Sequence, residues 1–497
     1  MCLRWPLIVL LLLLAPAPAW SQSAANVVLE SNEQLFCVMA GLNAAGYDTG
    51  MGTTTGDDTR LKVREFLQSR KAAVAPDLEK FYSAHRVGAD AGGDLGQYIS
   101  LALLLGSPPE FKFTVPQDQL PPDARDLQGF VSLLRTYYNQ GALLDLWAQV
   151  QPRYEAAVAR YTSAVRDNFV KTEAYFRLSS GGYLGRTYTI YIDLLGVPEQ
   201  VQARIYGLNY YLVVTPSKEP KIDEIRHQYL HFLLDPLAGK YAAEINQKAS
   251  LGGMVRQAPM LSLDFKEDFP LLVTECLIRA AELRLDKRSK ADAEKSLTEM
   301  TGTGLVLVRY FYDALAEFEK QDASLPLYYK EMILGINLRA EEKRLFDVHF
   351  TPRAPTAPGK AAPARSELER LLDQGDNQFF EGKYLDAKAS YQAVLEKLDP
   401  KNERALYGMA VVYANTRKPD LAEEYLAKTV ATAHDLRIVS WSHIYLGRLY
   451  DLSGKRDDAL AQYHAAALTA AAYPMAARAV ESGLARAFGS PEGTKKE

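Results

Sequence analysis

Residues 222–234, IDEIRHQYLHFLL, decide how the N-terminal part of this 497-residue chain is interpreted. The segment has a helical pattern, and His227 and His231 stand four residues apart, so their side chains point from one helix face. Two imidazoles one turn apart can share a metal ion, and zinc is the default for nitrogen ligands in an exported protein. The pair therefore predicts a zinc site, although histidines that are solvated or satisfied within a core would have the same spacing.

The flanking sequence predicts what surrounds this helix. Glu224 suits its first turn, where the helix dipole favours acidic groups. The helix is expected to end near Asp235, because the residue before a proline, here Pro236, disfavours the helical conformation. Before the helix, residues 186–194 and 202–214 alternate and are rich in β-branched and aromatic side chains, which predicts two neighbouring strands of a small sheet.

A third ligand is predicted on a later helix, residues 269–283, with the sequence FPLLVTECLIRAAEL. Glu275 stands among apolar residues there, and a buried carboxylate is costly unless it is paired or binds a metal. Glu275 is therefore the predicted third ligand, and Glu282, on the same face, is the alternative. An ion pair between Glu275 and Arg279, four residues on, would also explain the buried charge.

The segment with His227 and His231 resembles the active-site helix of zinc metallopeptidases with an H-E-x-x-H motif, in the branch called gluzincins. The resemblance covers about residues 180–290 and implies a mainly helical, zincin-like α+β domain. It also implies that His227, His231 and Glu275 hold zinc. The chain departs from the family at Gln228, where the motif has its glutamate.

The departure at Gln228 concerns catalysis more than metal binding. In the family the glutamate is the general base that takes a proton from the attacking water, and an amide cannot take it. Losing a positioned base typically costs about 10²- to 10⁴-fold in rate. The resemblance therefore implies an impaired enzyme that binds peptides, unless Glu224 or Asp235 substitutes as a relocated base.

The N-terminus predicts export. Arg4 precedes an apolar run at residues 7–15 that is too short to span a bilayer, and small residues follow it, with cleavage expected after Ala19 or Ser21. Residues 1–21 thus read as a signal peptide, and the protein is expected in the periplasm or outside the cell. No later run reaches 18 apolar residues, so no membrane span is expected in the mature chain.

Charge and cysteine content narrow the functional classes. A formal net charge of −4 and a pI near 6.1 argue against a nucleic-acid partner. Cys2 leaves with the signal peptide. Cys37 and Cys276 lie in apolar helical runs, which favours buried thiols over the alternative of one long-range disulfide.

The C-terminal part repeats. Residues 351–365, TPRAPTAPGKAAPAR, read as an extended linker. Beyond it Ala387, Ala422 and Ala459 recur at intervals of 35 and 37 residues. Small and aromatic residues at further fixed offsets make residues 366–475 resemble about three tetratricopeptide repeats, which implies an all-α solenoid that binds a protein or peptide partner. Residues 476–497 are expected to form a terminal helix and a disordered tail.

The remaining N-terminal sequence predicts helices within a domain spanning residues 26–350. Residues 31–44 should form an amphipathic helix with Ser31 as N-cap and Gln34 completing a capping box. Helical patterns also cover residues 59–85, 96–105 and 123–177.

Three hypotheses follow. The first is an exported, catalytically impaired zinc-metallopeptidase-like domain joined to a protein-binding repeat scaffold. The second is a metal-free scaffold protein, and the third is an active zinc peptidase with a relocated base.

Overall fold

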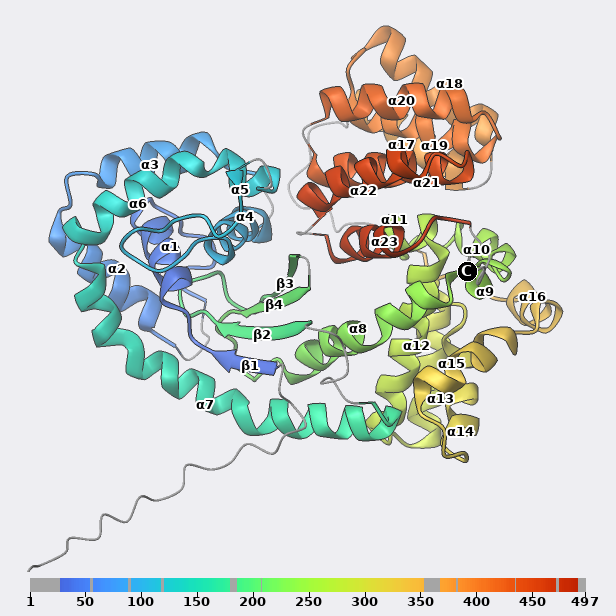
Figure 1. The fold of residues 1–497 in the computed structure, drawn as a ribbon, viewed down its shortest axis with the longest axis horizontal. Helices are drawn as coiled ribbons and strands as arrows, with labels where there is room; N and C mark the ends of the chain where they lie inside the picture. Colours follow the sequence, from blue (N-terminus) through green and yellow to red (C-terminus); the bar gives the residue numbers. More distant parts are fainter. Residues whose placement is uncertain are drawn as a thin grey trace, which may run out of the picture.

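The computed structural model describes residues 27–53, 57–87, 91–117, 120–178, 186–206, 208–352, 367–380, 383–433, 435–470 and 473–489. The predicted signal peptide, most of the predicted linker and the end of the predicted tail lie outside these residues. The fold is mostly helical with one small sheet (Figure 1).

Helices α1 to α6 form the first lobe of the molecule (Figure 1). The predicted cap of the first helix is wrong by one residue: Asn32 is the N-cap and its side chain accepts from Leu35 N at 2.7 Å, while Gln34 donates to Ser107 instead. The pattern at residues 59–85 is two helices, because Lys71 adopts a left-handed conformation. The bounds are α1 Glu33–Ala44, α2 Thr59–Arg70, α3 Ala75–Ala84, α4 Ala91–Leu103, α5 Pro122–Asp126 and α6 Gln128–Gln140.

The sheet has four strands in the order β1-β2-β4-β3. Strands β1, β2 and β4 run parallel, and β3 pairs antiparallel with β4 at one edge. The prediction of one strand over residues 202–214 is wrong, because Tyr206 pairs with Asn209 across a hairpin. Both arms carry the same alternating pattern, so periodicity alone could not divide them. The bounds are β1 Val27–Glu30, β2 Thr187–Ile192, β3 Val201–Tyr206 and β4 Asn209–Val214.

Three long helices support the sheet and the histidines. Helix α7 (Leu143–Phe176) runs from the first lobe beneath the sheet (Figure 1). Helix α8 (Ile222–Lys240) packs against α7 and against α12 (Phe269–Leu285). Tyr229 of α8 stacks on Phe169 of α7 with ring centroids 3.7 Å apart. Because this aromatic face of α8 is anchored, the opposite face presents its histidines to α12.

Helix α8 continues past the predicted end. Pro236 lies inside it, and a proline removes the backbone donor that would bond the carbonyl four residues back. That carbonyl, Phe232 O, accepts from the Arg186 guanidinium at 3.2 Å instead. The buried side chain of Arg186 thus compensates for the proline, and the helix extends to Lys240.

Short helices complete the N-terminal part, and one contiguous core runs from Leu35 to Leu345. Cys37 and Cys276 are free, buried thiols, as the sequence favoured. Among the described residues, no helix is long and apolar enough to cross a membrane. The remaining bounds are α9 Ala242–Asn246, α10 Ser250–Val255, α11 Leu263–Glu267, α13 Lys290–Thr303, α14 Val308–Phe318, α15 Leu325–Leu334 and α16 Leu338–Phe346.

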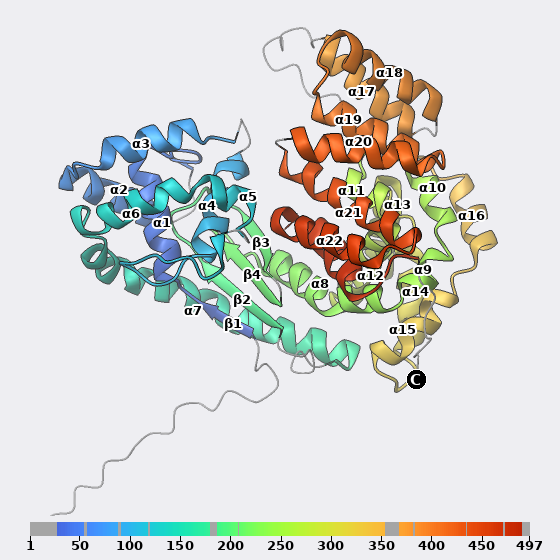
Figure 2. The same ribbon diagram turned by 45° about the horizontal axis from the view of Figure 1, so that its top comes forward.

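The C-terminal region stacks helical hairpins (Figure 2), and the helix α23 follows them (Figure 1). At both ends of the stack, a tyrosine of the second helix lies between two successive first helices: Tyr391 lies against Gly375 and Gly408, and Tyr463 against Gly447 and Gly483. Gly483 belongs to α23, so this helix takes the place of a fourth first helix. The bounds are α17 Glu367–Phe380, α18 Tyr384–Lys397, α19 Glu403–Asn415, α20 Pro419–Thr432, α21 Leu436–Leu452, α22 Arg456–Ala470 and α23 Pro474–Ala485.

The substitution Gly408→Ala should destabilise the repeats. An added Cβ would lie 2.5 Å from the Tyr391 ring, and this ring is fixed by a hydrogen bond from its hydroxyl to Asp376. We expect a loss of about 1–3 kcal/mol, seen as a lowered melting temperature by calorimetry. Gly253→Ala is the control, because a Cβ on this helical glycine meets no atom within 4 Å. Equal melting temperatures for the two variants would contradict the close packing of the Tyr391 ring against Gly408.

Candidate metal centre

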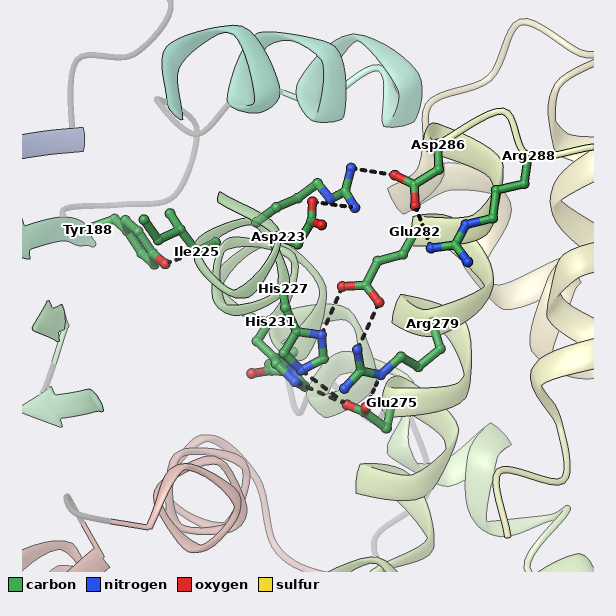
Figure 3. A network of polar contacts seen from close by, with 12 residues as sticks. Tyr188, Asp223, Ile225, His227, His231, Glu275, Arg279, Glu282, Asp286 and Arg288 are labelled. Carbon is green, nitrogen blue, oxygen red and sulfur yellow. Dashed lines mark hydrogen bonds and ion pairs between the residues drawn. The ribbon is translucent and has the colours of Figure 1, made fainter. Parts of the chain in front are cut away.

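The two helices α8 and α12 bring the three predicted ligands together (Figure 3). His227 and His231 project from α8 toward α12, and Glu275 projects back from α12. The Nε2 atom of His231 lies 3.3 Å from Oε2 of Glu275, and Nε2 of His227 lies 3.6 Å from the same oxygen. Within the described residues these three side chains form the group of potential ligand atoms that could hold a metal ion.

A carboxylate holds each imidazole on its far side. Glu282 Oε1 lies 3.0 Å from Nδ1 of His227, and Asp235 Oδ1 lies 3.2 Å from Nδ1 of His231. An ionised carboxylate only accepts hydrogen bonds, so these contacts suit the tautomer with the proton on Nδ1, which presents an unprotonated Nε2 to Glu275. Carboxylates in this position are the usual outer support of metal-ligating histidines.

The two Nε2 atoms and the carboxylate oxygen Oε2 of Glu275 meet at one small space. Three lone pairs that converge in this way repel one another unless a proton or a cation lies between them. The ligand atoms of a tetrahedral zinc ion, with bonds of about 2.0–2.1 Å, are about 3.3–3.4 Å apart. The separations of 3.3 and 3.6 Å from Glu275 Oε2 are close to this value, and all three potential ligand atoms lie within 4.8 Å of one another. Three protein ligands would leave the fourth position of zinc open.

Burial and charge set the protonation of the ligands. Burial lowers the pKa of His227 below its ordinary value, although the hydrogen bond with Glu282 opposes the shift. The ring is thus a neutral donor at pH 7. Burial alone would raise the pKa of Glu275, but the hydrogen bond with His231 and the guanidinium of Arg279 outweigh burial and hold this pKa well below its ordinary value. Glu275 is therefore ionised.

The site as a whole carries an excess of negative charge. It contains three carboxylates (Glu275, Glu282 and Asp235) and two guanidinium groups (Arg279 and Arg478). The three carboxylate side chains are each at most 13% exposed. The carboxylates therefore outnumber the guanidinium groups by one, and an uncompensated buried charge is costly. A cation among the ligands would offset it.

The structure locates each residue that the sequence singled out. Arg279 donates to Glu275 Oε1 at 2.7 Å, so the ion pair expected as an alternative is present, and it leaves Oε2 to the histidines. Glu282 supports His227 from behind and also accepts from Arg279 at 3.1 Å. Gln228 is half-buried on α8 beside His227.

The two candidates for a relocated base lie elsewhere. Glu224 is half-exposed and pairs with Lys221 at 3.3 Å. Asp235 contacts Nδ1 of His231, on the side of the ring that faces away from Glu275. Its supporting role could have been found from the sequence, because it follows His231 by four residues and shares its helix face.

The comparisons with known proteins bear on the C-terminal region alone. Residues 380–439 match the family model of the tetratricopeptide repeat. The match runs from α18 into α21, so the hairpins of this region carry tetratricopeptide repeats, a class that generally mediates protein–protein contacts. Neither a curated protein nor a solved structure matches the chain.

The geometry predicts that the protein binds one zinc ion per chain. His231→Ala removes one of three ligands, and we expect its zinc affinity to fall by more than the 10- to 100-fold typical of losing an outer partner. Isothermal titration after chelation measures this. His443→Ala is the control, because His443 lies in the repeats, where Nδ1 contacts Gln462 at 2.8 Å. Equal zinc binding by both variants would contradict the site.

Proposed function

We propose that the N-terminal domain is a zinc-metallopeptidase-like domain that holds zinc through His227, His231 and Glu275 and binds peptides with little or no cleavage. The observation that carries the proposal is the pair of Nδ1 atoms held by carboxylates, which leaves both Nε2 atoms facing Glu275 Oε2. Carboxylates placed in this way behind both imidazoles are the usual support of metal-ligating histidines.

The chemistry of the site depends on which groups can move a proton. Zinc, when bound, supplies a Lewis acid that polarises a carbonyl. Gln228 follows the first histidine, and its amide can orient a water or a substrate carbonyl by hydrogen bonding but cannot act as a base. Arg279 donates both to Glu275 and to Glu282 within α12 and so fixes the two carboxylates that face the histidines of α8. The residues therefore favour binding over hydrolysis.

A metal-free scaffold is the second candidate. The observation that favours it is the hydrogen bond of 2.7 Å from Arg279 to Glu275, because this contact satisfies part of the buried carboxylate without a metal. On this alternative one imidazole takes up a proton and pairs with Glu275. Zinc titration separates the two candidates, since only the first predicts stoichiometric binding.

The repeats add a partner-binding role to the proposal. One face of their first helices already holds a segment of the same chain: Asp264 accepts from Arg437 and from Trp441, at 2.8 and 3.0 Å. Glu267 likewise accepts from the Tyr407 hydroxyl at 2.9 Å. A protein or peptide partner would therefore use another face or displace this segment.

Export also belongs to the proposal. What supports it is the apolar run at residues 7–15 after Arg4, followed by the small residues of a cleavage region.

The substitution Gln228→Glu tests the enzymatic ancestry of the site. A restored base should raise zinc-dependent peptide hydrolysis by about 10²- to 10⁴-fold over the parent protein, measured by mass spectrometry on a peptide library. The double variant Gln228→Glu/His231→Ala is the control and should show no gain. A zinc-loaded Gln228→Glu protein that cleaves nothing would contradict a peptidase-like site. If the parent protein already cleaves peptides as fast as the Gln228→Glu variant, the result would support the hypothesis of a relocated base.

A further inference from the structure

The last helix of the repeat region reaches the metal centre. Helix α23 packs against α8 and the edge strand β3 (Figure 1). From it, the guanidinium of Arg478 forms an ion pair with Asp235 Oδ2, and both side chains are only 6% exposed. The other oxygen of Asp235 holds His231. Arg478 is thus connected to a predicted ligand through a single carboxylate.

A pocket lies beside the ion pair of Asp235 and Arg478, so the loss of Arg478 would expose Asp235 to water. Asp235 and Arg478 lie on the wall of a pocket of about 680 Å³ between α8, α12 and the end of the repeats. Without its guanidinium partner, a carboxylate on that wall is free to turn toward water, because hydration then replaces the lost ion pair. His231 would lose the acceptor that fixes its tautomer and its orientation.

A second arginine of the repeat region contacts the other ligand-bearing helix, α12. Asp268 is the N-cap of α12, where its side chain accepts from Leu271 N at 3.1 Å. Its other oxygen pairs with Arg448 of α21, and both side chains are largely buried. Asp268 precedes Glu275 by seven residues, or about two helical turns. Both ligand-bearing helices are therefore held by arginines of the repeat region.

We propose that Arg478 is a positioning residue of the metal centre, which makes the repeat region a structural part of the site that it adjoins. This inference rests on the proposed zinc binding. Arg478 touches no ligand; it orients Asp235, which orients His231. On this basis the repeats do more than recruit a partner, because displacing α23 from α8 would weaken the hold on the metal.

The variant Arg478→Met tests the proposal, since it keeps much of the side-chain length and removes the charge. We expect zinc affinity to fall by about 10- to 100-fold, the usual effect of losing an outer partner. Arg486→Met is the matched control. Arg486 also joins the end of α23 to α8, by donating to the carbonyls of Gly239 and Lys240, but it does not reach Asp235. This control should bind zinc as the parent does.

Two further measurements separate positioning from general destabilisation. The visible spectrum of the cobalt(II)-loaded protein should change in Arg478→Met and return toward the parent in Arg478→Lys. The double variant Asp235→Asn/Arg478→Met should bind zinc no more weakly than Asp235→Asn, because Arg478 acts through that carboxylate.

The possible results are distinguishable. A parent protein that binds no zinc overturns the proposed function together with this inference. A parent that binds zinc, beside an Arg478→Met variant of equal affinity and unchanged cobalt spectrum, overturns the inference alone. Equal losses in Arg478→Met and Arg486→Met also overturn it, because they would reflect domain docking in general.

Discussion

The candidate metal centre depends on the carboxylates that contact the two imidazole rings on the side away from Glu275. Glu282 and Asp235 each contact one Nδ1, and both Nε2 atoms face an ionised Glu275. The arrangement is electrostatically incomplete, because its lone pairs converge and its carboxylates outnumber its guanidinium groups. We propose that a divalent cation completes it. The aromatic anchoring of α8 on α7, the continuation of α8 past Pro236 and the N-cap of α12 all bring these groups within reach of one another.

The same contacts explain why the repeats and the N-terminal part share one structure. Arg448 and Arg478 reach from the repeats to acidic groups at the start of α12 and near the end of α8. Leu271 of α12 also packs within the repeat core. Truncating one partner of a buried charge pair leaves the other unpaired, which is more costly than losing a surface contact. The position of the repeats is therefore coupled to the geometry of the site.

Much of the site was predictable from local patterns, and its outer parts were not. The spacing of His227 and His231 gave one helix face, and a carboxylate in an apolar run pointed to Glu275. The supporting residue Asp235 was misjudged because Pro236 suggested a helix end, and the residue that offsets this proline, Arg186, is 50 positions away in the sequence. The hairpin of β3 and β4 was missed because both strands have one alternating pattern. Nothing local indicates Arg478, since its partner is 243 residues away and the contact exists only after the repeats have docked.

X-ray absorption spectroscopy of the zinc-loaded protein tests the central claim most directly, because it reports on the atoms that surround the metal. The account predicts one zinc ion per chain with two imidazole nitrogens and one carboxylate oxygen at about 2.0–2.1 Å. In the His231→Ala variant, one imidazole contribution should disappear from the spectrum. A zinc ion surrounded by oxygen atoms without imidazole, or a spectrum that is unchanged in this variant, would contradict the account.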